Sequence, residues 1–387
     1  MIFTRSSARG RLPVCVVRKR SVLRRMGLSY STMASHDGAV RRRPRAARSR
    51  AARAGAAARG RAPLPVGRGA RIVTPLEPDV REGPTMPVRA LLHYALEVPD
   101  QHAGETFYRL FGLASAGSRG EAVGLRPAPL AREAVLLYPG PRKCLHHLAF
   151  GAPGDDFDKV RASLARAGVR EVDPPREAPE GGIWFRDPDG NLVNVRPEAA
   201  QTPPPDPPLL INTPGHITRV AARGYREDLE ARPRRLGHVL LFTPDVDRQI
   251  AFYTRVLGMR LSDRARSLVA FLRCTTDHHN LAFLASKAPG FHHGSYEVGS
   301  VDEIAAGAQR MREAGFEQGW GLGRHVIGSN YFYYVRDPWG SFAEYFHDID
   351  YIPEDCAWQP RDFDERDALY QWGPPVPPYF AENTEAA

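Results

Sequence analysis

Three side chains that could bind a metal stand at matching landmarks in two similar segments of this 387-residue chain. In the segment that begins LGHVLLFT, they are His238, His293 and Glu344. In the segment that begins LLHYALEV, they are His93, His147 and Asn194. Two imidazoles and one carboxylate on one face of a metal, with the other positions open, form the facial triad of non-haem Fe(II) oxygenases. Because asparagine is a neutral and weaker ligand, we interpret the first copy as a retired metal site.

The spacings indicate that the two segments are copies of one unit. The two histidines are 54 residues apart in the first copy and 55 in the second. An Asp-Pro-x-Gly turn starts at Asp187 in the first copy and at Asp337 in the second, and the third landmark follows 7 residues later in both. Landmarks repeated in the same order predict a repeated structural unit.

Short strands and amphipathic helices are expected to position these landmarks. Residues 88–98 show the apolar alternation of a strand, and residues 104–113 carry apolar side chains at helical spacing. Residues 236–245 and 247–259 repeat this pair. The predicted fold is α+β, with the order βαβββ repeated within each of two tandem modules.

The predicted domain organisation has five parts. They are an Arg-rich segment 1–85, a first module 86–200 without a complete metal site, a Pro-rich linker 201–233, a metal-binding catalytic module 234–350, and a C-terminal tail 351–387. The proline cluster at 203–208 favours an extended linker. The aromatic side chains of the tail predict that it lies against the second module.

Charge divides the chain into two unlike parts. Residues 1–85 hold 20 Arg and Lys against 4 Asp and Glu, whereas the remainder holds 33 against 40. A mildly acidic body does not favour nucleic-acid binding. The basic segment is predicted to be a disordered extension or to precede a true start near Met86; a transit peptide and a nucleic-acid arm are the alternatives.

Apolar runs and cysteines bear on location. No apolar run approaches the roughly 18 residues that a membrane span needs, so we expect no membrane partner. The cysteines are widely scattered, at positions Cys15, Cys144, Cys274 and Cys356. This pattern favours a reducing compartment, and we expect the cytoplasm.

Residues 86–370 resemble the type I extradiol ring-cleavage dioxygenases of the vicinal oxygen chelate superfamily, the group of catechol and biphenyl-diol dioxygenases. The resemblance is most specific from His238 to Phe346. It implies that His238, His293 and Glu344 bind Fe(II), with Mn(II) possible, and that the first module is metal-free. It also implies a catechol-type aromatic substrate, dioxygen as co-substrate, and assembly as a homo-oligomer.

The same resemblance implies roles for three further side chains. His279 in DHHNLAF corresponds to an acid–base histidine, and His325 in GLGRH to a histidine that lines the substrate pocket. Tyr334 corresponds to a tyrosine that hydrogen-bonds a substrate oxygen. Their neighbours His278 and Tyr333 are the alternative choices. A separate expectation concerns His146 and His292, which precede their partners on strands and are therefore predicted to face the opposite side of the sheet and pack there.

The implied reaction is cleavage of an aromatic vicinal diol by dioxygen, meta to the diol, to a ring-opened semialdehyde or keto acid. Three alternatives share the fold: a glyoxalase-like or other non-redox metalloenzyme, a small-molecule binding protein of the bleomycin-resistance type, and a keto-acid dioxygenase of the 4-hydroxyphenylpyruvate type. The intact triad disfavours the binding protein, and Asn194 disfavours a metal shared by both modules. The identity of the diol is left open.

Overall fold

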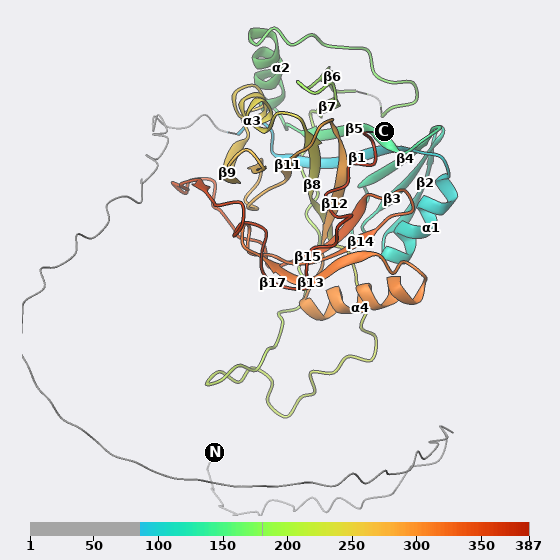
Figure 1. Ribbon diagram of the computed structural model, residues 1–387, viewed down its shortest axis with the longest axis vertical. Helices are drawn as coiled ribbons and strands as arrows, with labels where there is room; N and C mark the ends of the chain where they lie inside the picture. The colour runs from blue at the N-terminus through green and yellow to red at the C-terminus, as the bar shows by residue number, and fades with distance from the viewer. Residues whose placement is uncertain (1–85, 180, 387) are drawn as a thin grey trace, which may run out of the picture. The chain divides into compact units, whose positions relative to one another are not determined.

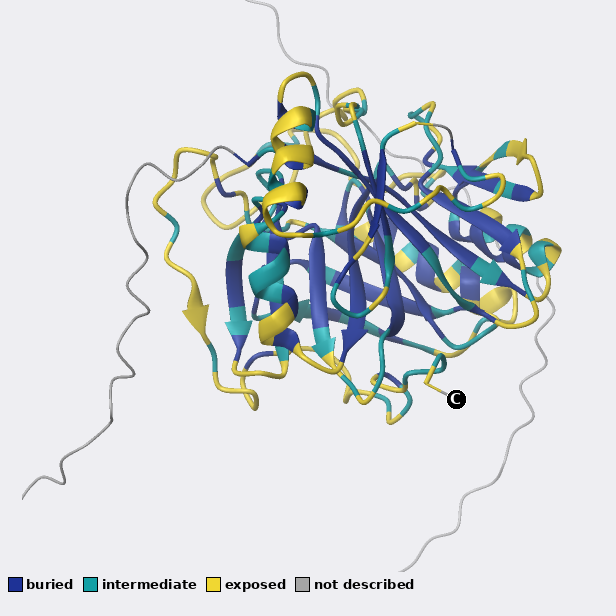
Figure 2. Cartoon of the chain, turned by 90° about the horizontal axis from the view of Figure 1, so that it is seen from above, coloured by how far each residue is buried: buried dark blue, intermediate teal, exposed yellow. Residues whose placement is uncertain are grey.

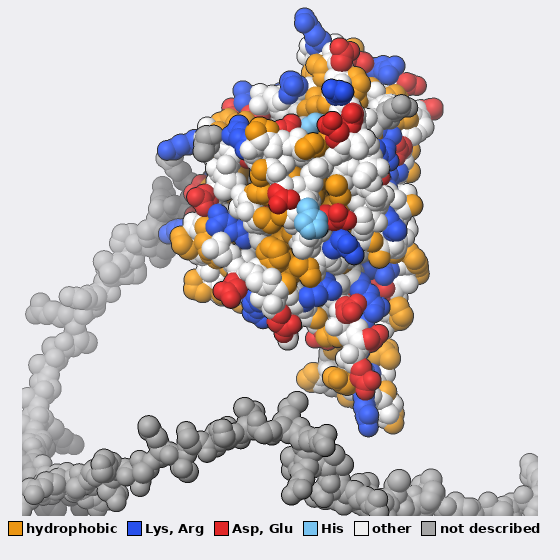
Figure 3. Space-filling model, turned by 90° about the vertical axis from the view of Figure 1, so that its right-hand side faces the viewer, with side chains coloured by type: hydrophobic (Ala, Val, Ile, Leu, Met, Phe, Trp, Pro, Cys, Tyr) orange, Lys and Arg blue, Asp and Glu red, His pale blue; other side chains and the backbone are white. Residues whose placement is uncertain are grey.

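A computed structural model describes residues 86–179 and 181–386. The predictions made for the Arg-rich segment 1–85 lie outside these residues. Within the described part, none of the helices combines the length and the apolar character that crossing a bilayer requires. On the face drawn in Figure 3, basic and acidic side chains are interspersed.

The first module is built on a seven-stranded sheet in the order β2-β3-β4-β1-β5-β7-β6. Its elements run, in chain order, β1 (Ala90–Val98), α1 (Gln101–Phe111), β2 (Ala114–Arg119), β3 (Ala122–Arg126), β4 (Val135–Pro139), β5 (Cys144–Gly151), α2 (Asp156–Arg166), β6 (Ile183–Arg186) and β7 (Leu192–Arg196). The central strands β1 and β5 pair antiparallel, and β1 pairs parallel with β4.

The second module repeats this arrangement in a ten-stranded sheet, ordered β16-β9-β10-β11-β8-β12-β15-β14-β13-β17 (Figure 1). Its elements are β8 (Arg235–Thr243), α3 (Val246–Arg255), β9 (Arg260–Ala265), β10 (Val269–Arg273), β11 (Leu281–Ala285), β12 (Gly290–Glu297), α4 (Val301–Glu313), β13 (Gly319–His325), β14 (Tyr331–Arg336), β15 (Phe342–His347), β16 (Arg361–Asp362) and β17 (Tyr370–Trp372). The predicted α+β class with tandem modules is confirmed.

One strand of the predicted pattern is missing from the first module. The unit that starts at β5 has two strands after its helix, β6 and β7, where three were expected. A single bridge between Glu171 and Phe185 stands in place of the third. The segment that follows contains Pro174, Pro175 and Pro179, which have no N–H to donate to a ladder. In the second module, β13 fills this position.

The helices form where their sequences supply a cap and an apolar face. The Asp100 carboxylate accepts from the N–H of Ala103 at the start of α1, and Asp245 accepts from Arg248 at the start of α3. Helix α1 ends at Gly112, whose φ of 113° lies in the left-handed region that glycine adopts without strain. The helices bury one face and expose the other (Figure 2).

The core is continuous across the two modules. The rings of Phe111 and Tyr345 stack with centroids 3.8 Å apart. The hydroxyl of Tyr296 in β12 donates to Tyr94 in β1 over 3.0 Å, and the Tyr94 and Tyr108 hydroxyls lie 2.9 Å apart. All five rings are fully buried.

Residues 351–386, which we call the C-terminal segment, lie against the second sheet. Strand β16 pairs with β9 at one edge of that sheet, and β17 pairs with β13 at the other. Phe380 and Tyr379 pack on a cluster that contains Trp320, Tyr334 and Phe342. This position brings the segment close to the residues described next.

Candidate metal centre

Three adjacent strands of the second sheet carry the predicted ligands. His238 lies on β8, His293 on β12 and Glu344 on β15, and these strands are neighbours in the order β8-β12-β15. All three side chains are at least 97% buried. Their ligand atoms lie within 4.8 Å of one another. The structure therefore brings the predicted triad together from positions up to 106 residues apart.

The distances within the triad suit a divalent metal. His238 Nε2 lies 3.0 Å from Glu344 Oε2, and His293 Nε2 lies 3.4 Å from the same oxygen. Donors at right angles, each about 2.1 Å from one ion, are about 3.0 Å apart. His293 Nε2 is buried and has no hydrogen-bond partner. A buried lone pair beside a carboxylate is what a metal ligand set requires.

Electrostatics favour the ligating forms of these groups. Burial and the neighbouring His292 lower the pKa of His293 well below its ordinary value, so its imidazole is neutral. Burial raises the pKa of Glu344, but its contacts with the imidazoles of His238 and His325 outweigh burial, and the net pKa lies well below the usual range. A neutral imidazole and an ionised carboxylate are the forms that coordinate a cation.

The three further predicted side chains border the triad. The ring of His279 lies 4.2 Å from that of His238, between centroids. His325 Nε2 lies 3.0 Å from the hydroxyl of Tyr334 and 3.8 Å from Glu344 Oε1. All six predicted residues thus share one cluster, in which His325 is half-buried and the other five are buried. Burial, followed by His238 and His278, lowers the pKa of His279 well below its ordinary value.

The geometry separates these residues from their alternative neighbours. Tyr333 packs into the core on the other side of β14, whereas Tyr334 faces His325. His278 lies behind His279: its Nδ1 is 3.1 Å from His279 Nδ1, and its Nε2 is 2.8 Å from Asp263 Oδ2. Asp263 is a polar neighbour of the site that the sequence did not indicate, and His278 was named only as the alternative to His279.

His292 was predicted to pack on the opposite face, and that prediction is incomplete. Its ring does contact Phe242, Phe342 and Phe380. It also makes two polar contacts, with His293 Nδ1 at 2.6 Å and with the Phe380 carbonyl at 2.7 Å. Burial lowers the pKa of His292 to about 4. The adjacent histidines at 292 and 293 were the one feature of the sequence that could have indicated these polar contacts.

The first module keeps the histidines but arranges its third landmark differently. His93 Nε2 and His147 Nε2 lie 3.0 Å apart, with each other as partners. The Asn194 amide donates to the carbonyls of Gly181 and Ile183. Among His, Cys, Asp and Glu side chains of the described residues, the second-module triad is the one group placed to hold a metal.

Comparisons with known proteins agree with this geometry. The family model of the glyoxalase/bleomycin resistance protein/dioxygenase superfamily matches residues 90–195 and 235–345. The chain belongs to this superfamily. Metapyrocatechase 2 of Cupriavidus necator is 47% identical to it over 306 residues, which cover 78% of this chain and 94% of the relative.

Two further relatives extend the comparison. An iron-dependent extradiol dioxygenase of Rhodococcus jostii is 27% identical, over 74% of this chain and 97% of its own length. The crystal structure of a Mn(II)-bound glyoxalase from Novosphingobium aromaticivorans is 28% identical, with a TM-score of 0.62, over 78% of this chain and 99% of its own. The predicted membership of the type I extradiol dioxygenases within the superfamily is confirmed.

Proposed function

We propose that this extradiol dioxygenase holds Fe(II) through His238, His293 and Glu344, and that a catechol-type vicinal diol binds beside them. The observation that carries the proposal is the buried triad bordered by His279, His325 and Tyr334. A bound metal would supply an electrophilic centre that binds diol and dioxygen together. The remaining chemistry falls to the side chains.

Each bordering residue has a distinct task in this proposal. The pKa of His279 is lowered by burial, so its neutral imidazole accepts the proton of a diol hydroxyl and later returns it. The Tyr334 hydroxyl lies 3.0 Å from His325 Nε2 and redirects its one proton from that nitrogen to a substrate oxygen when the diol binds. Burial raises the pKa of Tyr334 well above its ordinary value, so the hydroxyl stays protonated and can act as a hydrogen-bond donor.

The choice between Fe(II) and Mn(II) is also a proposal. The two imidazoles and one carboxylate accept either ion. One relative is named iron-dependent and one structural neighbour is a Mn(II)-bound glyoxalase. A relative from Geobacillus genomosp. 3, named a manganese-dependent 2,3-dihydroxybiphenyl 1,2-dioxygenase, is 24% identical to this chain. We favour Fe(II) because the iron-dependent extradiol dioxygenase, at 27% identity, is the more similar of these two dioxygenases.

The first experiment is anaerobic reconstitution of the full-length protein with Fe(II) or Mn(II), followed by dioxygen uptake and absorbance with a panel of catechols. We expect one metal per chain and a yellow ring-fission product. His293→Ala should lose both metal and product, whereas the matched His147→Ala in the first module should lose neither. Stoichiometric metal without turnover of any diol would move the assignment to a non-redox metalloenzyme, and failure to hold metal would overturn the triad.

We propose further that the protein is a homo-oligomer, assembled through the linker 201–233. Apolar side chains of this linker are exposed to solvent, from 48% for Leu209 to 77% for Val220, together with Leu210, Ile211, Ile217 and Tyr225. Contiguous exposed apolar side chains mark interaction surfaces. Light scattering should show a multimer, and Ile211→Asp should shift it toward the monomer; a monomeric wild type would contradict the proposal.

A cytoplasmic location is proposed from cysteine usage. Cys144, Cys274 and Cys356 are free thiols in the described part of the chain. Free thiols suit a reducing compartment. Fractionation of the native cells tests this, and recovery in an extracellular or membrane fraction would contradict it.

A further inference from the structure

A backbone carbonyl of the C-terminal segment determines which nitrogen of His292 carries its proton. His292 is buried among Phe242, Phe342 and Phe380, where the neutral imidazole is the stable form. Its Nε2 lies 2.7 Å from the Phe380 carbonyl oxygen. A carbonyl oxygen only accepts, so the single proton of His292 sits on Nε2. The other nitrogen, Nδ1, is therefore a lone pair.

This lone pair in turn fixes the neighbouring metal ligand. His292 Nδ1 and His293 Nδ1 are 2.6 Å apart, and only one proton can lie between them. Since His292 Nδ1 is the acceptor, His293 Nδ1 donates. The proton of His293 is thus on Nδ1, and its Nε2 presents a lone pair beside Glu344. That is the tautomer a metal requires.

A second carbonyl of the segment acts on His325 in the same way. His325 Nδ1 lies 2.7 Å from the Leu369 carbonyl oxygen, so Nδ1 carries the proton in the neutral ring. His325 Nε2 is then an acceptor, and the Tyr334 hydroxyl donates a hydrogen bond to it over 3.0 Å. This orients the Tyr334 hydroxyl within the candidate site.

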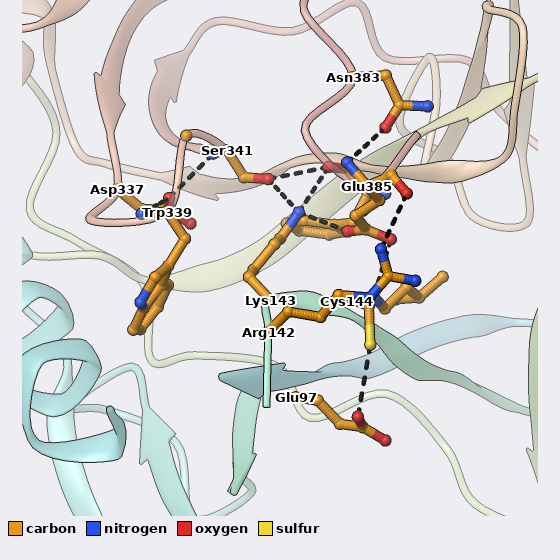
Figure 4. Close-up of polar contacts among 12 residues, drawn as sticks. Glu97, Arg142, Lys143, Cys144, Asp337, Trp339, Ser341, Asn383 and Glu385 are labelled. Carbon is orange, nitrogen blue, oxygen red and sulfur yellow. Dashed lines mark hydrogen bonds and ion pairs between the residues drawn. The ribbon is translucent and has the colours of Figure 1, made fainter. Parts of the chain in front are cut away.

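A buried ion pair ties the end of the segment to both modules (Figure 4). Glu385 Oε1 lies 2.5 Å from Lys143 Nζ of the first module, and both side chains are at least 92% buried. The Glu385 carboxylate also accepts from the N–H of Leu145 on β5 and from that of Phe291 on β12, each over 3.1 Å. Lys143 further donates to the Phe291 carbonyl over 3.0 Å. Phe291 precedes His293 by two residues.

We infer that the C-terminal segment is a positioning element of the metal centre: its Phe380 and Leu369 carbonyls set the tautomers of His293, through His292, and of His325, and the Glu385–Lys143 pair holds it in place. The inference rests on the proposed function, because it concerns the proposed metal ligand and the proposed partner of Tyr334. His292, Lys143 and Glu385 are positioning residues and touch neither metal nor substrate.

The test reads the tautomers directly in the full-length, metal-free protein. Long-range ¹H–¹⁵N correlations of a ¹⁵N-histidine-labelled sample should show His293 protonated on Nδ1 and His292 on Nε2. His292→Phe removes the acceptor, so His293 should lose its single tautomer, and the affinity for Zn²⁺ should fall about 10–100-fold. His292→Asn returns an acceptor oxygen near Nδ1 and should recover part of that affinity.

Matched controls separate positioning from general stability. His146→Phe changes the equivalent residue of the first module and should leave Zn²⁺ affinity and the His293 tautomer unchanged. Glu385→Gln should lower Zn²⁺ affinity and broaden the His325 signals, even at temperatures well below unfolding. A wild-type His293 protonated on Nε2, or unchanged metal affinity in His292→Phe, would overturn the inference. Neither outcome depends on turnover, whereas the proposed function fails only if the wild type holds no metal or cleaves no diol.

Discussion

The two modules share one scaffold and two histidines of the candidate site, and they differ at the other positions around that site. The strand pairing within each module gives His93 the same position as His238, and His147 the same position as His293. They also set Asn194 opposite Trp184 in the first module where Glu344 stands opposite Tyr334 in the second. The first module thus keeps the imidazoles and has lost the carboxylate and the phenol. Because the first module lacks this carboxylate and phenol, we expect it to have no catalytic activity of its own.

The remaining differences lie where the backbone itself has changed. His325 stands on β13, and the first module has a Pro-containing segment in place of that strand. Leu281 pairs with Val239, the residue after His238, and Val135 pairs with Tyr94, the residue after His93. Two residues before these paired positions stand His279 in the second module and Glu133 in the first, so the two are equivalent. His292 contacts a carbonyl of the C-terminal segment, whereas the ring of His146 stacks on Tyr138. The two modules therefore differ at more than the third ligand position.

The largest expected effect comes from giving the second module the ligand set of the first. Glu344→Asn removes the only carboxylate of the triad and leaves two neutral ligands. We expect complete loss of ring cleavage and a fall in metal affinity of more than about 100-fold, since changes to the partners of ligands alone cost roughly 10–100-fold. Metal analysis and dioxygen uptake measure both. Asn194→Ala is the control and should retain full metal content; full activity in Glu344→Asn would break the comparison.

The next effect tests the proton-transfer position. His279→Phe should lower kcat by about 10²–10⁴-fold, the range for loss of a general acid–base group, with metal content unchanged. Glu133→Gln, at the equivalent position of the first module, should leave kcat within roughly a factor of two, since it affects only a partly exposed ion pair. Equal effects of the two changes would contradict the assignment of His279.

The reverse exchange should have a smaller and conditional effect. Asn194→Glu places a buried carboxylate near the Gly181 and Ile183 carbonyls, which now accept from the Asn194 amide. Without metal, we expect a loss of about 1–3 kcal/mol in the free energy of unfolding. Added Zn²⁺ should recover it by binding the native state, with His93 and His147 as co-ligands. Thermal unfolding with and without Zn²⁺ measures this change. No response to Zn²⁺ would show that the corresponding site of the first module does not accommodate an ion.

The smallest effect concerns a single hydrogen bond. Tyr334→Phe removes the hydroxyl and keeps the ring that packs on Trp320 and Phe380. Loss of about 0.5–1.5 kcal/mol of transition-state stabilisation corresponds to a decrease in kcat/KM of about 2- to 13-fold. Trp184→Phe is the matched change in the first module and should leave kcat/KM unaltered. Steady-state kinetics under saturating dioxygen measures kcat/KM of both variants, and an equal decrease in the two would contradict the role of the Tyr334 hydroxyl.

The sequence was sufficient to predict the fold, and the six residues that it proposed for the site lie together in the structure, because each had a recognisable local sequence pattern. The ligands stand at fixed distances from an Asp-Pro turn and from a His-His pair, and duplication displays the same marks twice. The missing strand of the first module was not predicted, although Pro174, Pro175 and Pro179 gave a reason for it. The expected third strand followed from the apolar alternation elsewhere in that module and not from these prolines.

The neighbours of the site could not be predicted in the same way. Asp263 meets His278 from another strand, and Phe380 reaches His292 from 88 residues further along the chain. A contact made by a main-chain carbonyl leaves no residue type to recognise. Lys143 and Glu385, 242 residues apart, look like ordinary surface charges until the chain is folded.

The tyrosine cluster at the module junction bears on how a retired half survives. Tyr94 and Phe111 of the first module and Tyr296 and Tyr345 of the second belong to one core, so neither half has a complete interior alone. Deleting the first module would expose the apolar side of the strands that carry the metal ligands. The first module therefore contributes to the stability of the second whether or not it holds a metal. It persists as the other half of a shared interior.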